Sequence, residues 1–429
     1  MPGLYSLPPT SKSLFPVSPM RKLTLILAAV LAAYCSAGIL SEMVWPNNEE
    51  VKGVLCRLLL CTNASLVGRA RQQLAEVGEE DVQEAVALFR RALQRDPQNP
   101  YRWADLGEAF LEAGQKEDAR YCYVQALALA PYSAPFLLRV ANFHFQIGEN
   151  EKALPITARI LTLIPDYDSV IFSEYTRLVG QVEDVLRSGL PQGCRAAESW
   201  LRFVIQAGRL DDAQRTWEWV VGRGYADDAL VGEYAEFLIR QGHPDWAASA
   251  WARYLGTRSG DYRKSTYLFN GGFESEPAQS PFDWNVARTQ GVEVARDCTT
   301  AWSGKCSLRI KFAGTKNLDF AAASQLAFVM PGPYRFHAFI RSEGLTTDQG
   351  IRFRISDAEV PARLDVIFGQ FTGTRPWSPV EQAFVVSPET RLLQVQVIRK
   401  PSLKFDNKVG GTAWIDELRL EPMGNRLPR

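Results

Sequence analysis

Residues of similar character recur 34 positions apart in the first half of the chain, and this recurrence limits the folds available to it. One set of apolar and small residues, Trp103, Leu106, Gly107, Phe110, Gly114, Ala119, Tyr123, Ala126 and Pro131, is followed by a matching set at Leu137, Val140, Ala141, His144, Gly148, Ala153, Thr157, Ile160 and Pro165. A fixed period of this length is typical of units that bury their apolar faces only by stacking on their neighbours. The segment is therefore predicted to present an extended surface rather than to enclose an active site.

The period and its residue pattern resemble tetratricopeptide repeats. In that family each unit is two antiparallel helices, with small residues where the helices cross closely and a proline after the second helix. An earlier unit has the same spacing at Ala85, Phe89, Ala92 and Pro97, and later units run from Trp200 to Tyr254 after an irregular stretch around residues 180–195. The resemblance implies an all-α superhelix over residues 66–256, preceded by a linker and first helix over residues 41–65.

The repeat register predicts which residues line the inner groove, because the first helix of each unit lines this face in the family. These groove candidates are Tyr101, Glu108, Leu138, Asn142 and Phe145. They do not match the basic and asparagine pattern with which some members bind acidic peptide C-termini. A mixed apolar and polar groove favours a helix or an extended segment of a protein partner. The alternative is that Tyr101 and Phe145 merely cover neighbouring repeats.

An uncharged apolar segment, residues 23–40, follows Arg21 and Lys22 near the N-terminus. Its length suits a bilayer crossing, and basic flanks stay in the cytoplasm. We therefore expect a cytoplasmic segment over residues 1–22, a transmembrane signal-anchor helix over residues 23–40, and the remaining chain on the periplasmic side or in the cell envelope. The alternatives are a cleaved signal peptide, lipid attachment at Cys35, and a buried helix.

Alternating apolar residues replace the helical period from about Thr266 onward. In two of these runs, Leu308, Ile310 and Phe312 alternate with polar residues, and so do Leu393, Val395 and Val397. A period of two, interrupted by Gly and Pro, predicts an antiparallel β-sandwich over residues 266–422. A short linker, residues 257–265, would precede the sandwich, and a tail, residues 423–429, would follow it.

Four motifs of this second half resemble carbohydrate-binding modules of the galactose-binding-like jelly-roll type. They are FNGGFE from Phe269, FDW from Phe282, WSGKCSLRI from Trp302 and GTAWIDELRL from Gly411. In that family a calcium ion often ties the first strand to the last. The resemblance implies Glu274 and Asp416 as its ligands, and calcium prefers such oxygen ligands. The alternative is that both carboxylates point to solvent.

Sugar binding needs an exposed aromatic face against which a pyranose ring can lie. The candidate aromatic residues are Trp284, Trp302, Trp377 and Tyr334, whereas Trp414 lies between Ala413 and Ile415 and is expected to be buried. Core packing is the alternative for each of them.

Two cysteines, Cys298 and Cys306, flank a segment whose Ser303, Gly304 and Lys305 predict a turn. They could face each other across a hairpin as a disulfide, or they could be two buried thiols.

Composition and motifs argue against several functional classes. The 48 basic and 48 acidic residues balance, so charge gives no case for nucleic acid. The three histidines have no nucleophile or metal motif beside them, and no phosphate-binding glycine loop is found. We therefore predict a non-catalytic, membrane-anchored scaffold that binds protein through its repeats and glycan through its sandwich, in cell-surface polysaccharide assembly or export. The alternatives are a purely structural interaction module and, least favoured, a glycoside hydrolase.

Overall fold

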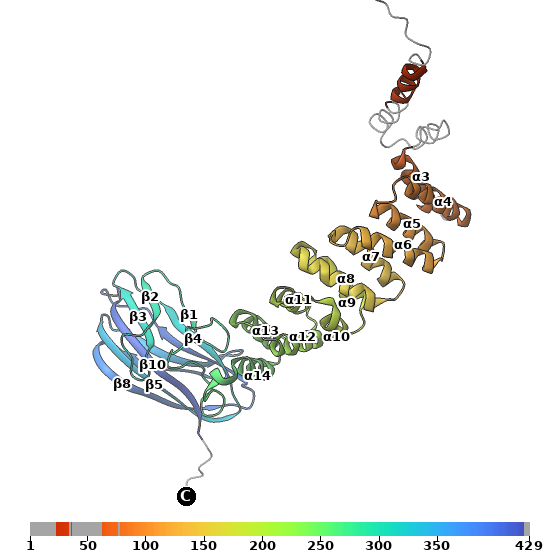
Figure 1. Ribbon diagram of the computed structural model, residues 1–429. Coiled ribbons are helices and arrows are strands. Elements are labelled where there is room, and N and C mark those ends of the chain that lie inside the picture. Colours follow the sequence, from red (N-terminus) through yellow and green to blue (C-terminus); the bar gives the residue numbers. More distant parts are fainter. Residues whose placement is uncertain (1–22, 34–35, 37–61, 76–77, 424–429) are drawn as a thin grey trace, which may run out of the picture. The chain divides into compact units, whose positions relative to one another are not determined.

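The computed structural model describes residues 23–33, 36, 62–75 and 78–423 of the chain (Figure 1). The chain forms two compact units, residues 1–164 and 165–429, which we call unit 1 and unit 2. Several expectations lie outside the described residues: the cytoplasmic segment 1–22, lipid attachment at Cys35, most of the linker 41–65 and most of the tail 423–429.

The N-terminal apolar segment is described only in part. Residues 23–33 are helical, and their side chains are exposed. Among the described residues, no helix combines the length and the hydrophobicity that a membrane crossing requires. The transmembrane helix over residues 23–40 therefore stays a prediction.

Unit 1 is built from successive pairs of helices. Its described repeat helices are α3 (Asn63–Ala75), α4 (Glu79–Arg95), α5 (Pro100–Glu112), α6 (Lys116–Leu129), α7 (Ala134–Gln146) and α8 (Asn150–Leu163). Asn99 caps α5 by accepting a hydrogen bond from the backbone N–H of Tyr101 at 3.0 Å, and Pro100 follows at the first helical position. Gly114 and Gly148, 34 residues apart, turn the chain after α5 and α7 with φ angles of 74° and 79°.

Close helix packing in unit 1 depends on small residues, as the repeat pattern predicts. A Cβ atom at Gly107 of α5 would lie 2.9 Å from Cε2 of Tyr123 in α6, which is closer than carbon atoms normally approach. Tyr123 in turn stacks on Phe143 of α7, with ring centroids 4.3 Å apart. The glycine therefore lets the aromatic ring pass between neighbouring helices.

Unit 2 begins with further helices. They are η1 (Pro165–Tyr167), α9 (Asp168–Leu178), α10 (Val182–Asp184), η2 (Val185–Gly189), α11 (Cys194–Gln206), α12 (Leu210–Gly222), α13 (Asp228–Arg240), α14 (Pro244–Leu255) and η3 (Gly256–Ser259). The irregular stretch expected near residues 180–195 contains the short α10 and a π-helical turn, η2. The hydroxyl of Tyr175 donates to the carbonyl of Gly189 at 2.7 Å and ties this turn to α9. The 34-residue period is lost here because the second helix of this repeat is cut short.

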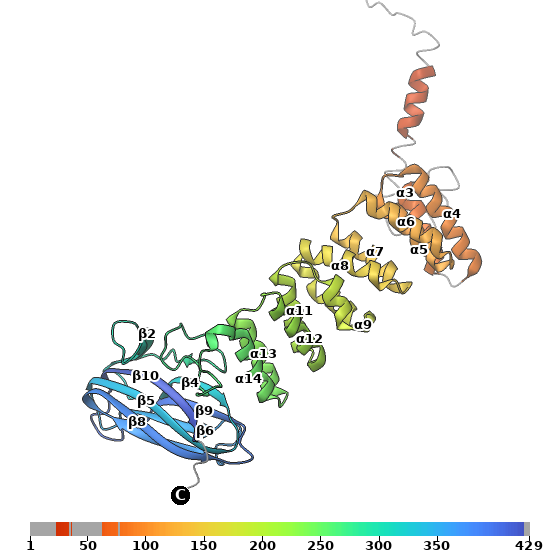
Figure 2. The ribbon, with the colours of Figure 1, turned by 60° about the horizontal axis from the view of Figure 1, so that its bottom comes forward.

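The second part of unit 2 is a sandwich of two five-stranded antiparallel sheets (Figure 2). Its strands are β1 (Asn285–Val286), β2 (Val292–Asp297), β3 (Ser307–Ala313), β4 (Phe320–Phe328), β5 (Gly332–Leu345), β6 (Ile351–Asp357), β7 (Asp365–Phe371), β8 (Gly373–Val386), β9 (Leu392–Arg399) and β10 (Gly410–Pro422). One sheet has the order β1-β4-β9-β6-β7 and the other β2-β3-β10-β5-β8. Leu308, Ile310 and Val395 lie in the core between them, as the alternation predicts. The predicted order, a helical repeat region and then an antiparallel sandwich, is confirmed.

The sandwich packs directly against the last repeat helices within unit 2. The ring of Phe269 lies 5.8 Å from Trp251 of α14 and 5.9 Å from Tyr262, measured between centroids. The guanidinium of Arg263 lies over Phe328 of β4 at 5.8 Å. We therefore call the β1-β4-β9-β6-β7 sheet the helix-side sheet and the other the open sheet.

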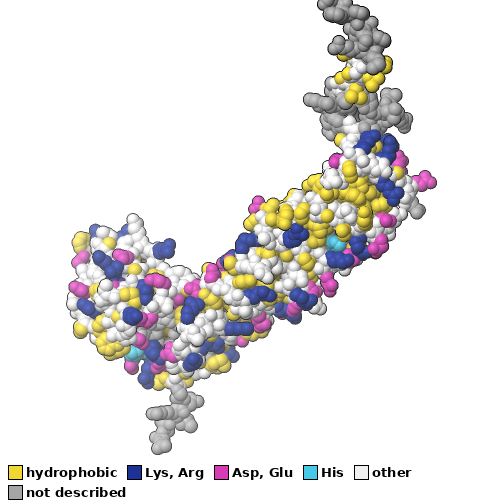
Figure 3. Space-filling view, in the orientation of Figure 1, with side chains coloured by type: hydrophobic (Ala, Val, Ile, Leu, Met, Phe, Trp, Pro, Cys, Tyr) yellow, Lys and Arg dark blue, Asp and Glu magenta, His cyan; other side chains and the backbone are white. Residues whose placement is uncertain are grey.

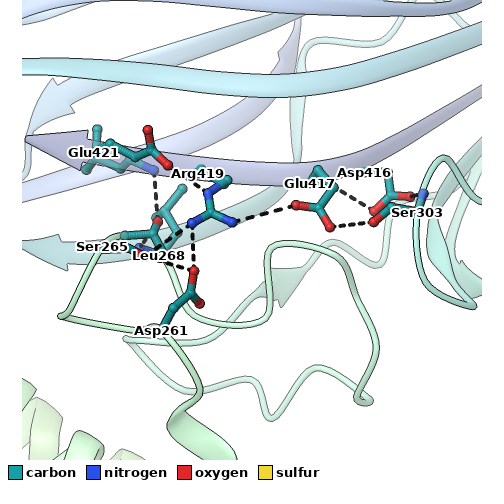
Figure 4. A network of polar contacts seen from close by, with 10 residues as sticks. Asp261, Ser265, Leu268, Ser303, Asp416, Glu417, Arg419 and Glu421 are labelled. Atoms are coloured by element: carbon teal, nitrogen blue, oxygen red, sulfur yellow. Dashed lines mark hydrogen bonds and ion pairs between the residues drawn. The ribbon is translucent and has the colours of Figure 1, made fainter.

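Polar contacts join the linker to the last strand (Figure 4). Nη2 of Arg419 in β10 donates to Asp261 at 2.6 Å and to Ser265 at 3.2 Å, and its Nε donates to Glu421 at 2.8 Å. The backbone N–H of Tyr267 also donates to the carbonyl of Leu420 at 2.8 Å. The linker 257–265 is therefore bonded to the sandwich rather than free of it.

Candidate functional site

An aromatic cluster lies on the outer surface of the open sheet. Trp302, in the loop between β2 and β3, is 47% exposed. Its ring stacks on Phe339 of β5, with centroids 4.2 Å apart and planes inclined by 21°, and its centroid lies 6.4 Å from that of Trp377 in β8. We call Trp302, Phe339 and Trp377 the aromatic platform. It brings together two of the four aromatic residues predicted to bind glycan.

Two carboxylates, buried Asp416 and exposed Glu274, hold the loop that carries Trp302. Asp416 is 0% exposed, and its carboxylate accepts hydrogen bonds from the backbone N–H groups of Trp302 at 2.7 Å and Ser303 at 3.1 Å. Oε1 of Glu274 accepts from the N–H groups of Lys305 at 2.7 Å and Cys306 at 3.1 Å. These bonds fix the position of the Trp302 ring relative to the sheet below it.

A disulfide closes the same loop. It joins Cys298 to Cys306, whose Cα atoms lie 4.0 Å apart. The loop that carries Trp302 is thus held by a covalent bond at its base as well as by the two carboxylates, so little conformational freedom is left to lose when a ligand binds.

Charged side chains surround the platform. Arg341, Glu343 and Arg375 line a surface pocket that includes Trp377. The guanidinium of Arg341 lies 5.1 Å from the ring centroid of Trp414, which is half-buried on the same outer face. An exposed aromatic ring beside hydrogen-bonding side chains is the arrangement that sugar recognition requires.

The prediction that Trp284 and Tyr334 bind glycan was wrong, because both side chains lie in the core. Trp284 is 0% exposed and packs against Phe273, and its indole N–H donates to the carbonyl of Asn270 at 3.0 Å. Tyr334 is 2% exposed, and its hydroxyl accepts from the N–H of Met330. Neither ring has a face left for a sugar.

Sequence reasoning also missed residues of the site. Trp414 is half-buried rather than buried, because it alternates in β10 with the inward-facing Ala413 and Ile415. Its N–H donates to Oδ2 of Asp297 at 2.9 Å. This bond, together with others to Thr299, lowers the pKa of Asp297 although burial opposes the shift. The sequence motifs did not point to Phe339. Phe339 lies two residues from both His337 and Arg341, which face outward from β5. This alternation could have identified Phe339 as a residue of the outer face.

A second candidate binding surface, which is polar, lies where the helix-side sheet meets α13. Glu236 and Arg240 of α13 and Ser324 and Gln394 of the sheet line a cleft of about 330 Å³. No aromatic side chain lines this cleft. It offers hydrogen bonds from both sides but no surface for ring stacking.

The two expected calcium ligands lie around one glycine. A Cβ atom at Gly272 would lie 3.5 Å from Oδ1 of Asp416, 3.6 Å from Oε1 of Glu417 and 3.9 Å from Cγ of Glu274. The space that the glycine leaves is thus bordered by carboxylate oxygens of Asp416 and Glu417 and by Cγ of Glu274, whose own carboxylate accepts from Lys305 and Cys306. Carboxylate oxygens are ligands that calcium prefers. Among the described residues, however, no cluster of three or more His, Cys, Asp or Glu side chains is arranged to hold a metal. Main-chain oxygens would have to complete the ligand set.

The backbone beside these carboxylates is strained. Asn270, Phe273 and Glu417 have φ angles of 51°, 52° and 53°, a region that residues with side chains seldom adopt. Gly271 also approaches β10 closely, since a Cβ atom there would lie 1.9 Å from the carbonyl oxygen of Leu418. Burial raises the pKa of Asp416, although backbone N–H donors oppose the shift. A cation would relieve the cost of that buried negative charge.

The groove residues predicted in unit 1 have different surroundings. Tyr101 is 45% exposed, Asn142 is exposed and Leu138 is half-buried. Glu108 is bound to Arg139, so its carboxylate is already paired. Phe145 is only 7% exposed and packs among the repeats, so its assignment to the groove was wrong.

Sequence reasoning missed a charged ladder in unit 1. Asp105 is 1% exposed and accepts hydrogen bonds from Arg71 at 3.3 Å, Arg102 at 3.3 Å and Arg139 at 2.8 Å. Arg71, Asp105 and Arg139 occupy the same repeat position 34 residues apart. The ladder therefore links successive repeats, and the repeat register itself could have revealed it.

Unit 1 also exposes apolar side chains on α6 and directly after it. On the face shown in Figure 3, hydrophobic side chains gather over its helices. Tyr121 and Val124 of α6 are 60% and 55% exposed, and Tyr132 after α6 is 76% exposed. Such a surface suits contact with another protein.

Known proteins resemble the two halves of the chain separately. Two tetratricopeptide repeat family models match residues 76–121 and 104–168. The helices of this stretch are tetratricopeptide repeats. A human protein, general transcription factor 3C polypeptide 3, is 24% identical over 133 residues, which are 30% of this chain and 15% of that protein. This chain thus spans a small part of that relative.

Solved carbohydrate-binding modules resemble the sandwich. TmCBM61, in complex with beta-1,4-galactotriose, is 21% identical and covers 37% of this chain and 99% of its own, with a TM-score of 0.28. A xylan-binding domain from CBM 22 is 16% identical and covers 38% of this chain and 97% of its own, with a TM-score of 0.27.

Proposed function

We propose that this chain is a non-catalytic scaffold that binds protein partners through its repeats and glycan through the aromatic platform of its sandwich. The observation that carries the glycan part is the exposed ring of Trp302, stacked on Phe339 and close to Trp377. The protein part is supported by the repeats and by the exposed apolar side chains of α6. Balanced charge gives no support to a nucleic-acid partner.

The platform suits a sugar for two physical reasons. The free face of Trp302 is flat and apolar, so it can pack against the C–H groups of a pyranose ring. Arg341 and Glu343, which share a pocket with Trp377 of the platform, offer a donor and an acceptor for hydroxyl groups. Because the loop is already held by Asp416 and the disulfide, binding costs little ordering of the loop.

The experiment is a glycan array probed with the full chain, followed by titration of any glycan that binds. Trp302→Ala and Trp377→Ala should each weaken binding about tenfold or more, because a stacking contact is lost. Trp246→Ala is the matched control, since Trp246 is 39% exposed but lies on α14. Equal affinity in all four proteins would refute the platform as the site.

A purely structural role for the sandwich is the second candidate. The contact of Phe269 with Trp251 and Tyr262 favours it, because the sandwich covers the end of the repeat helices within unit 2. In that case no glycan binds, and loss of the sandwich lowers the stability of α13 and α14.

The same proposal includes membrane anchoring and export. It rests on the apolar residues 23–40 and their basic flank, which favour an anchored chain outside the cytoplasm, in assembly or export of a surface polysaccharide. Fractionation of cells that express the chain should place it in membranes, with the repeats open to protease added from outside. Recovery as a soluble cytoplasmic protein would contradict this part.

We also propose that calcium binds beside Gly272, held by Glu274 and Asp416. Binding to the folded chain alone would raise its stability, by about 2.7 kcal/mol at a hundredfold excess over Kd. Thermal unfolding with calcium should therefore give a higher Tm than with chelator, and Asp416→Asn should remove most of the difference. Identical Tm values with calcium and chelator in the unsubstituted chain would refute the ion without affecting the platform.

A further inference from the structure

The loop between β9 and β10, residues 400–409, carries the most exposed large hydrophobic side chains among the described residues. Leu403 is 98% exposed and Phe405 is 105% exposed. The next most exposed on the sandwich, Val385, is 68% exposed and lies at the end of β8. Fully exposed apolar side chains of this size are unfavourable in water, so two on one loop call for a function.

Hydrogen bonds hold both ends of this loop to the body of the sandwich. The N–H of Ser402 donates to Asn317 at 2.9 Å, and its hydroxyl donates to Asp348 at 2.5 Å. At the other end, the N–H of Val409 donates to the carbonyl of Lys316 at 3.1 Å. The loop that carries Leu403 and Phe405 therefore projects from a base that is hydrogen-bonded to the sandwich at both ends.

Basic side chains flank the two apolar ones. Lys400, Lys404 and Lys408 belong to the loop, whereas Asp406 is its one acidic residue. Lys400 and Lys404 lie 4.0 Å from Asp319 and Asp348, respectively, and their side chains are 46% and 72% exposed. Such exposed pairs are weak, so both lysines can turn towards a negatively charged surface.

We propose that this loop inserts into a lipid surface that bears anionic headgroups. Leu403 and Phe405 would enter the boundary between headgroups and acyl chains, while the three lysines meet the headgroup phosphates. A lipid surface takes up apolar side chains without a complementary pocket, and the alternation of Leu403, Lys404 and Phe405 provides both interactions from one short segment. This inference does not rest on the aromatic platform, which lies on the outer face of the open sheet.

The test places an environment-sensitive fluorophore on the loop of the full chain. Phe405→Cys is labelled at the new thiol, and Val385→Cys is the matched control at the opposite end of the sandwich. The unsubstituted chain treated with the same label gives the signal of the native thiols. A probe on the loop is needed because residues 23–40 could hold the whole chain on vesicles by themselves.

Vesicles of phosphatidylcholine with phosphatidylserine should shift the emission of the probe at position 405 to the blue and raise it roughly twofold or more, as expected on entry into an apolar layer. Vesicles of phosphatidylcholine alone should have a smaller effect, and Lys400→Glu, Lys404→Glu and Lys408→Glu together should abolish the response. The probe at position 385 should not respond. An unchanged emission at position 405, or equal responses at both positions, would overturn the proposal and favour a protein partner for the loop.

Discussion

The outer faces of the two sheets differ although their inner faces are alike. Both sheets send alternate aliphatic residues such as Ile310 and Val395 into one core. The open sheet carries the exposed ring of Trp302, whereas β4 of the helix-side sheet lies against the last repeat helices. Both sheets have the same alternating strand pattern, so the difference between their outer faces comes from what lies next to each face. An aromatic ring stays exposed on the face that the repeat helices do not cover.

The largest difference in unfolding free energy is expected between a variant of a core tryptophan and a variant of a platform tryptophan. Trp284→Ala removes a fully buried ring and should cost about 3 to 5 kcal/mol of unfolding free energy. Trp302→Ala should cost less than about 1 kcal/mol, because its ring is half in solvent. Urea unfolding of both variants measures the difference. Similar losses would show that Trp302 serves the fold rather than a ligand.

The unfolding free energy should depend on pH through a buried carboxyl in the loop that precedes β1. Asp283 is 1% exposed, and burial raises its pKa to about 6, although N–H donors of Ala278 and Trp284 oppose the shift. Since the folded state favours the protonated carboxyl, the unfolding free energy contributed by this group should fall as pH rises from about 4 to 6. The fall should approach about 3 kcal/mol at most.

The measurement is urea unfolding at pH 4.5 and pH 7 for the unsubstituted chain and Asp283→Asn. The amide cannot ionise, so the variant should lack this part of the dependence, and the difference between the two proteins isolates it. If the unsubstituted chain and Asp283→Asn differ in unfolding free energy by the same amount at both pH values, Asp283 is ionised in the folded state throughout.

A smaller effect should test the joint between α13 and the sandwich. A Cβ atom at Gly232 would lie 3.6 Å from Cβ of Ser280, so Gly232→Leu should overpack the joint and cost about 1 to 3 kcal/mol. Gly222→Leu is the matched control, because nothing lies within 4 Å of a Cβ atom there. Equal Tm values for the two variants would show that this contact contributes little to holding the helix-side face.

The sequence predicted the two folds better than the site. The 34-residue spacing predicted that Ala119, Tyr123 and Ala126 are buried, because one register applies to successive repeats. The structure buries all three. It did not predict the short α10 and the π turn after it, where the second helix is cut short. Periodicity is informative only where the structure is periodic.

The sequence pattern could not tell buried loop residues from exposed ones. Trp284 and Trp302 both follow turn-like segments, and only the tertiary fold buries one and exposes the other. Asp416 was expected as a metal ligand by resemblance, but its bonds to the N–H groups of Trp302 and Ser303 join residues more than a hundred positions apart. No local sequence signal reports such contacts.

The most direct test of the account compares the two faces with one ligand. A glycan that binds the full chain is titrated calorimetrically into the unsubstituted protein, Trp302→Ala on the open sheet and Gln394→Ala on the helix-side sheet. We expect Trp302→Ala to weaken the affinity about tenfold or more and Gln394→Ala to leave it within about twofold. Loss of binding in Gln394→Ala with normal binding in Trp302→Ala would place the sugar in the cleft beside α13 and contradict the account.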